Sequence, residues 1–208
     1  SGAQALKGTT YHHLIVNKSA GTATAGAAFT CNGDLTINNA GTLASGNFTH
    51  AVTGTTSISA GVLSTSNTTS IFNLQNLSMT GGSIAGATAG TVSVATTFSI
   101  PSGTATINTC TFTVESTTSI TGGIIFNINN SGLNTFKGTV TLNAGSTWNS
   151  SALTSTSANL VFRGGIVSNG TSFSAGSGRF NTVSPQTISG PTSLVFSNRL
   201  SVIGVTLN

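Results

Sequence analysis

Carboxylates are the first side chains to consider for chemistry, and this chain has very few. Its 208 residues contain two acids, Asp34 and Glu115. A glycosidase needs a pair of carboxyl groups roughly 5–9.5 Å apart, and a calcium or magnesium site needs six or more oxygen ligands, carboxylates prominent among them. Two acids so far apart in the sequence cannot supply the carboxylate ligands of a calcium or magnesium site. We expect both to be solvated or locally hydrogen-bonded, and we predict no catalytic carboxylate pair.

Histidine and cysteine are the remaining candidates for ligands or nucleophiles. His12 and His13 are adjacent, so on a strand they would point to opposite faces, and with His50 they would supply at most a partial metal site. We therefore expect surface histidines, no metal and no cofactor. Cys31 and Cys110 are 79 positions apart (110 minus 31), and we predict two unpaired, buried thiols.

The composition also points away from catalysis. Charged residues make up 4% of the chain, the net charge is +4 and the hydrophobic fraction is 37%. No serine has a recognisable histidine and aspartate partnership, and six dispersed basic residues make too weak a field for nucleic acid. No run of 18 apolar residues occurs, so no membrane span is expected. Abundant Ser, Thr, Gly and Asn with Val, Ile and Phe are typical of β structure, and this hydroxyl-rich exterior indicates a secreted or cell-surface protein.

The elements that would position these side chains follow from a repeat of about 20 residues. Glycines recur at a nearly constant interval along the chain. They are Gly21, Gly41, Gly61, Gly82, Gly103, Gly123, Gly145 and Gly165. Apolar residues recur three and five positions before these glycines and two positions after them. The members are Ile58, Met79, Ile100, Ile120, Leu142 and Phe162, then Leu77, Phe98, Val140 and Leu160, then Leu43, Leu63, Ile84, Ile125 and Val167, with Thr56, Thr118, Ala23, Ala105 and Thr147 filling gaps.

Alternate residues on a strand face the same side, so these columns would point inward and glycine would turn the chain. The pattern predicts an all-β fold, a parallel β-solenoid (β-helix) of about ten coils with 20–21 residues per coil. Residues 1–208 would form a single domain, less regular at 168–182. An antiparallel β-sandwich with turns every 8–12 residues is the alternative fold.

The two ends of the chain resemble each other. Gln4 and Gly8 match Gln186 and Gly190 at one offset, so the end coils 1–21 and 183–208 share a character. An open solenoid exposes unpaired backbone at its ends, and no capping helix is evident from the sequence. We therefore predict end-to-end stacking through the terminal coils. The interface residues would be Tyr11, His12, His13, Leu14, Ile15, Val16, Leu200, Val202, Val205 and Leu207.

Three phrases carry a resemblance to a known class of protein. They are Gln-Thr-Ile-Ser-Gly at 186–190 with Leu194 to Asn198, the segment Gly8 to Gly21, and Gly33 to Leu43. These segments resemble the repeat regions of large secreted Bacteroidota surface proteins, which are β-rich and associated with adhesion, gliding or extracellular matrix. The resemblance implies an extracellular filament or adhesin, although residues 168–182 depart from the regular repeat.

These observations lead to one functional expectation and one alternative. We expect a non-catalytic, rod-like subunit or segment of an extracellular filament or adhesin stalk. Its partner would be itself, as a head-to-tail homopolymer or as neighbouring repeats of a longer chain, with cell-surface or matrix polysaccharide as a further partner. The alternative is an ice- or polysaccharide-binding surface. Thr22 and Thr24 share columns with Thr104 and Thr106 in the 20-residue alignment, but the intervening coils do not sustain a regular threonine plane.

Overall fold

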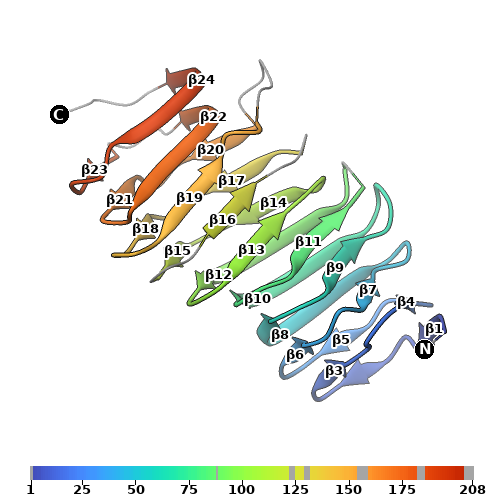
Figure 1. Ribbon diagram of the computed structural model, residues 1–208. Coiled ribbons are helices and arrows are strands. Elements are labelled where there is room, and N and C mark those ends of the chain that lie inside the picture. The colour runs from blue at the N-terminus through green and yellow to red at the C-terminus, as the bar shows by residue number, and fades with distance from the viewer. Residues whose placement is uncertain are drawn as a thin grey trace.

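The protein is a β-solenoid in the computed structural model, a stack of about nine turns that carries the chain from one end of a rod to the other (Figure 1). The structure describes residues 2–87, 89–121, 125–128, 132–153, 159–181 and 186–203, the segment 125–128 through its backbone alone. All strand pairings among these residues are parallel. The predicted solenoid is therefore confirmed, and the antiparallel sandwich is wrong.

Each turn contributes three strand segments, which stack on their counterparts in the next turn to form three faces. Face A contains eight separate strands. They are β1 (Gln4–Leu6), β4 (Thr22–Ala25), β7 (Thr42–Ala44), β9 (Val62–Thr65), β11 (Ser83–Gly86), β13 (Thr104–Ile107), β16 (Ile125–Ile128) and β19 (Thr147–Ser150). Face B contains five separate strands. They are β2 (Thr10–Tyr11), β5 (Thr30–Cys31), β14 (Thr111–Val114), β17 (Asn134–Phe136) and β20 (Leu160–Phe162).

Face C contains six separate strands. They are β3 (Leu14–Val16), β6 (Leu35–Ile37), β15 (Thr117–Ile120), β18 (Val140–Leu142), β21 (Ile166–Ser168) and β23 (Ile188–Ser189). Five longer strands run across two faces without a break. The strands β8 (Thr49–Ile58), β10 (Ile71–Met79) and β12 (Thr91–Ile100) join face B to face C, while β22 (Ser172–Asn181) and β24 (Leu194–Ile203) join face A to face B.

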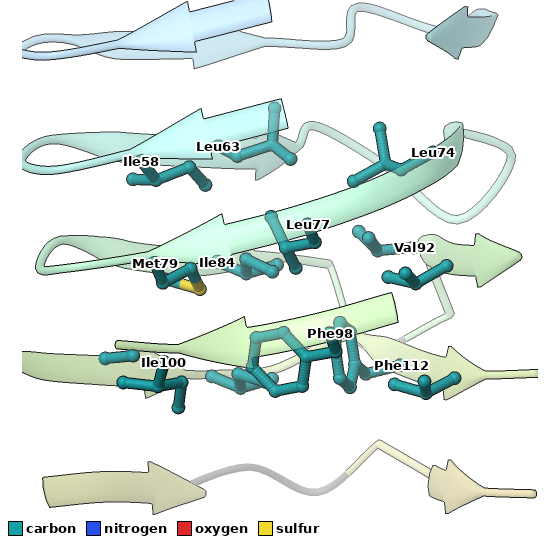
Figure 2. Close-up of a cluster of buried hydrophobic side chains, with 14 of the residues drawn as sticks. Ile58, Leu63, Leu74, Leu77, Met79, Ile84, Val92, Phe98, Ile100 and Phe112 are labelled. Carbon is teal, nitrogen blue, oxygen red and sulfur yellow. The ribbon is translucent and has the colours of Figure 1, made fainter. Parts of the chain in front are cut away.

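The core consists of columns of side chains that continue from turn to turn. On face C, Leu77 stacks on Phe98, and Met79 lies in the column that contains Ile58 and Ile100. Figure 2 shows how these side chains and those of face A fill the space between the strands. Inward and outward residues alternate along each strand, and the inward ones are almost completely buried. Each turn therefore covers the apolar side chains of its neighbours, which a single turn could not do alone.

Aromatic side chains form the core of the C-terminal half. Phe136 packs edge-on against Trp148, with ring centroids 5.4 Å apart, and stacks on Phe162 at 5.8 Å. Phe162 in turn stacks on Phe180 at 5.4 Å. Such pairs contribute about 0.5–1.5 kcal/mol beyond their buried area. This continuous aromatic column links three successive turns and stabilises their stacking.

The 20-residue alignment is wrong near the C-terminus, because one turn is longer than the sequence pattern predicts. Val140 pairs with Ile166, a step of 26 residues (166 minus 140). Phe162 and Leu160 consequently lie in inward columns of face B rather than face C. Val167 faces outward and is half-buried.

A smaller shift occurs between β11 and β13 on face A. Ile84 pairs with Ile107 rather than with Ala105, and Ile125 pairs with Thr104 and Thr147. The predicted inward column through Ile84, Ala105 and Ile125 is therefore wrong. The two extra residues are Thr104 and Ala105 at the start of β13, which pair with β16, whereas the register with β11 begins at Thr106.

Glycine makes the turn from face C to face A possible. Gly61, Gly82 and Gly103 adopt φ values of 77°, 71° and 78°. This left-handed region strains residues that carry a Cβ atom. Gly165 also has a positive φ, of 85°, but it stands between β20 and β21, at the corner from face B to face C. It is therefore not equivalent to the other marker glycines.

Candidate functional site

The first turn is one candidate site, because among the described residues its strands have neighbours on one side only. Strands β1, β2 and β3 pair with β4, β5 and β6. Leu14 and Val16 point inward and are buried, whereas the side chain of Ile15 points outward and is 64% exposed. Of the predicted interface residues at this end, Tyr11, Leu14 and Val16 therefore occupy core columns and Ile15 does not.

The last turn is the second candidate site. In the described chain, β23 pairs with β21, and β24 pairs with β22. Leu200 is aligned with Gly178 and Val202 with Phe180, so both stand in inward columns. They are nevertheless 48% and 40% exposed. The predicted interface residues Val205 and Leu207 lie outside the described residues.

Exposed apolar side chains are concentrated on this last turn. Among the described residues, five of the seven large hydrophobic side chains that are exposed belong to it. They are Ile188, Val195, Leu200, Val202 and Ile203. An open hollow of about 300 Å³ lies beside them, with Phe180, Leu194 and Phe196 in its lining. Because isolated soluble proteins rarely expose a contiguous apolar patch without a reason, this end is a candidate contact surface.

The two end turns have matching chemistry. Leu6 and Tyr11 at the N-terminal end and Leu194 and Phe196 at the C-terminal end pack against the core but are only partly buried. These four side chains are the outermost members of columns that are buried in the interior turns. The two ends lie at opposite extremes of the stack (Figure 1), so one molecule cannot bring its own ends together.

His12 and His13 lie at the corner between β2 and β3 rather than within a strand. Their rings are 4.5 Å apart, so the prediction that they point to opposite faces is wrong. Nδ1 of His13 accepts a hydrogen bond of 2.9 Å from the backbone N–H of Asp34. Oδ1 of Asp34 accepts a 2.8 Å bond from the backbone N–H of Thr55. This corner therefore links three successive turns, and Asp34 has a structural role there.

The second acid, Glu115, forms an ion pair on the same corner several turns away. Nζ of Lys137 donates to both carboxylate oxygens of Glu115 at 2.7 Å. Both side chains are about two-fifths exposed, so the pair contributes little stability, about 0–1 kcal/mol. Asp34 and Glu115 are thus in different turns with different partners, and they do not form a catalytic pair.

His50 is completely buried, and the prediction of a surface histidine is wrong for this residue. Its ring lies between Phe29 and Phe72, with centroid distances of 4.2 and 4.9 Å. Nδ1 accepts a 3.2 Å hydrogen bond from the backbone N–H of Phe29, and Nε2 lies 2.8 Å from the carbonyl oxygen of Ser45. These partners require a neutral ring with its proton on Nε2. Burial lowers the pKa of His50 below 6.5, although the bond to Ser45 opposes this.

Both cysteines are free and buried, as predicted. Sγ of Cys31 lies 3.3 Å from the carbonyl oxygen of Asp34. Burial raises the pKa of Cys110 to about 12, which keeps this thiol protonated and unreactive at neutral pH. Within the described part of the chain, no group of three His, Cys, Asp or Glu side chains could hold a metal ion.

The threonines considered for an ice-binding surface are arranged differently from the sequence alignment. Thr106, not Thr104, is in register with Ser83 and therefore shares an outward column with Thr22. Val62 interrupts that column. Face A therefore does not carry a regular threonine plane.

Two features of these sites were not predicted from the sequence. The stack of Phe29, His50 and Phe72 was recoverable, because the three residues are 21 and 22 positions apart, close to the period of the repeat. Leu200 and Val202 were identified as end residues, but their alignment with Gly178 and Phe180 depends on the irregular turns before them.

Comparison with known proteins gives no match to a family model, to a curated protein sequence or to a solved structure. Among the described residues, no helix is long and apolar enough to cross a membrane.

Proposed function

We propose that this chain is a stiff, non-catalytic rod in an extracellular filament or adhesin stalk, and that its end turns stack on another turn of the same kind. The neighbouring turn belongs either to a second copy or to adjoining repeats of a longer chain. A hydroxyl-rich, almost uncharged composition is consistent with secretion, and parallel backbone ladders along the axis would give the rod its stiffness.

One observation carries this proposal: Leu200 and Val202 stand in core columns and are nevertheless about half exposed. A further turn laid on β24 would bury them, and each buried leucine or valine contributes about 1.5–3 kcal/mol. The same turn would also continue the parallel backbone ladder beyond β24. If the register of the inner turns continued, Val202 of one copy would meet Tyr11 of the next, because both residues stand in the same inward column of face B.

Electron microscopy and size-exclusion chromatography of the purified chain over a range of concentrations test the subunit version. We expect rods whose length grows with concentration. The variant carrying Leu200→Asp and Val202→Asp should remain monomeric, because it would bury two unpaired charges in the junction. Val195→Asp is the matched control, since Val195 is 52% exposed on the same strand but points outward.

A wild-type chain that stays monomeric at every concentration would rule out the subunit version. The segment version is then tested with two copies fused in tandem. A fusion that forms one rod of doubled length would support it, and two separately tumbling units would contradict it.

A further inference from the structure

Face C carries two outward columns of hydroxyl and amide side chains that run unbroken through five successive turns. In each turn the two residues are separated by one inward position, and strand pairing places each pair directly on the next. The pairs are Thr55 with Ser57, Asn76 with Ser78, Thr97 with Ser99, Thr117 with Ser119, and Thr139 with Thr141.

The backbone fixes the spacing of this array. Neighbouring turns are roughly 4.8 Å apart, and residues i and i+2 of a strand are about 6.6 Å apart. Four of the five members of the first column are threonines, whose branched Cβ restricts the side-chain rotamer. The result is a periodic lattice of polar groups on one face of the rod.

The hydroxyls at the centre of the lattice are available to an external partner. Within the described part of the chain, those of Ser57, Ser78 and Ser99 form no hydrogen bond with another protein group. Their inward neighbours Leu77 and Phe98 are buried, which holds the strand in place beneath them. The hydroxyls are therefore presented outward on a fixed support.

The charge distribution indicates an uncharged partner. No charged residue stands in the two columns between Thr55 and Thr141, although the chain carries a net charge of +4. Asp34 lies one turn beyond Thr55 and accepts a 2.8 Å hydrogen bond from its backbone N–H, while Glu115 and Lys137 lie at the adjoining corner and neutralise each other in their ion pair. An anionic polymer would find no cation to bind on this face.

Two other uncharged partners, a sugar polymer and a second copy of the same face, fit face C less well than ice does. Sugars usually bind where aromatic side chains are available for stacking, but these columns contain none, and Trp148 is completely buried. A second copy of the same face would cover about 300 Å² per partner, estimated from five turns and four residues, whereas a stable interface covers about 800 Å².

We propose that face C binds ice. A two-dimensional array of fixed hydroxyls offers donors and acceptors to rows of water molecules that are already ordered in the crystal. Ordering one water molecule from the liquid costs up to about 2 kcal/mol, but water at an ice surface has already lost that freedom. A rigid, uncharged and periodic surface therefore prefers ice to liquid water. This proposal does not depend on end-to-end stacking.

Thermal hysteresis and inhibition of ice recrystallisation, measured on the purified chain, test the proposal. We expect the wild-type chain to be active in both assays. The variant Thr97→Lys with Thr117→Lys, which places two charges on adjacent turns of face C, should lose both activities. The matched control is Thr91→Lys with Thr111→Lys, since these threonines are also paired on adjacent turns but face outward on face B. Circular dichroism checks that both variants remain folded.

Three outcomes would overturn the proposal. They are an inactive wild-type chain, equal loss of activity in both variants, and binding of the wild-type chain to insoluble cellulose or chitin without any effect on ice. The last result would identify face C as a polysaccharide surface if Thr97→Lys with Thr117→Lys abolished the binding.

Discussion

The most informative single residue is His50, a polar ring enclosed in an apolar column. Its lowered pKa means that the folded state binds a proton less readily than the unfolded state, in which the pKa is about 6.5. The stabilising contribution is therefore complete above pH 6.5 and is lost as the pH falls toward the folded-state value. Over that interval the free energy of unfolding should fall by up to about 1.4 kcal/mol per pH unit.

The substitution His50→Phe tests this linkage. At pH 8 we expect the variant to be less stable by about 1–3 kcal/mol, because the Phe29 N–H and the Ser45 carbonyl lose their partner. At pH 5 the difference should shrink, since the wild type alone carries the cost of protonating this buried ring. Urea unfolding at both pH values measures the two differences. A difference that is independent of pH would show that His50 does not titrate as described.

At the level of the strands and corners, Gly103 illustrates what the repeat requires. Its φ of 78° is in the left-handed region, and a Cβ atom at this position would overlap the carbonyl oxygen of Thr80 in the preceding turn. We expect Gly103→Ala to lower the free energy of unfolding by more than about 2 kcal/mol. Gly26→Ala is the control, because its φ is not in that region and the nearest atom would be 3.4 Å away. Equal effects in urea unfolding would contradict this explanation.

The same corners explain how much of the fold the sequence could predict. The glycines and the columns through Leu77 and Met79 were recognisable because a turn of constant length repeats them at a constant interval. Leu160 and Phe162 were placed on the wrong face, since a buried apolar residue does not reveal which of three faces it belongs to. The length of a corner costs little free energy to change, so the 26-residue step from Val140 to Ile166 has no clear signal in the sequence.

At the candidate sites, residues in columns were more predictable from the sequence than residues at corners. Leu200 and Val202 were predictable as end residues because an open solenoid must expose its last turn. The orientation of His12 and His13 was not predictable, since the strand rule fails where the chain bends between β2 and β3. The lattice on face C was not recognised, because it depends on which residues pair across β8, β10, β12, β15 and β18.

The whole molecule behaves as a stack in which each turn contacts its neighbours, so stability should vary along the axis. Amide hydrogens of β12 lie between two turns, whereas β24 has a described neighbour on one side. Local opening is easiest where fewest contacts must be broken. In dilute solution we therefore expect fast amide exchange in β24 and in β1, β2 and β3, and slow exchange in β12.

If the end turns stack as proposed, this gradient depends on concentration. As rods lengthen, each junction should convert two terminal turns into interior ones, so exchange in β24 and in the first turn should slow together while β12 is unchanged. Hydrogen exchange followed by mass spectrometry at several protein concentrations measures this directly. Rods that lengthen while β24 continues to exchange at its dilute-solution rate would show that the molecules associate through another surface.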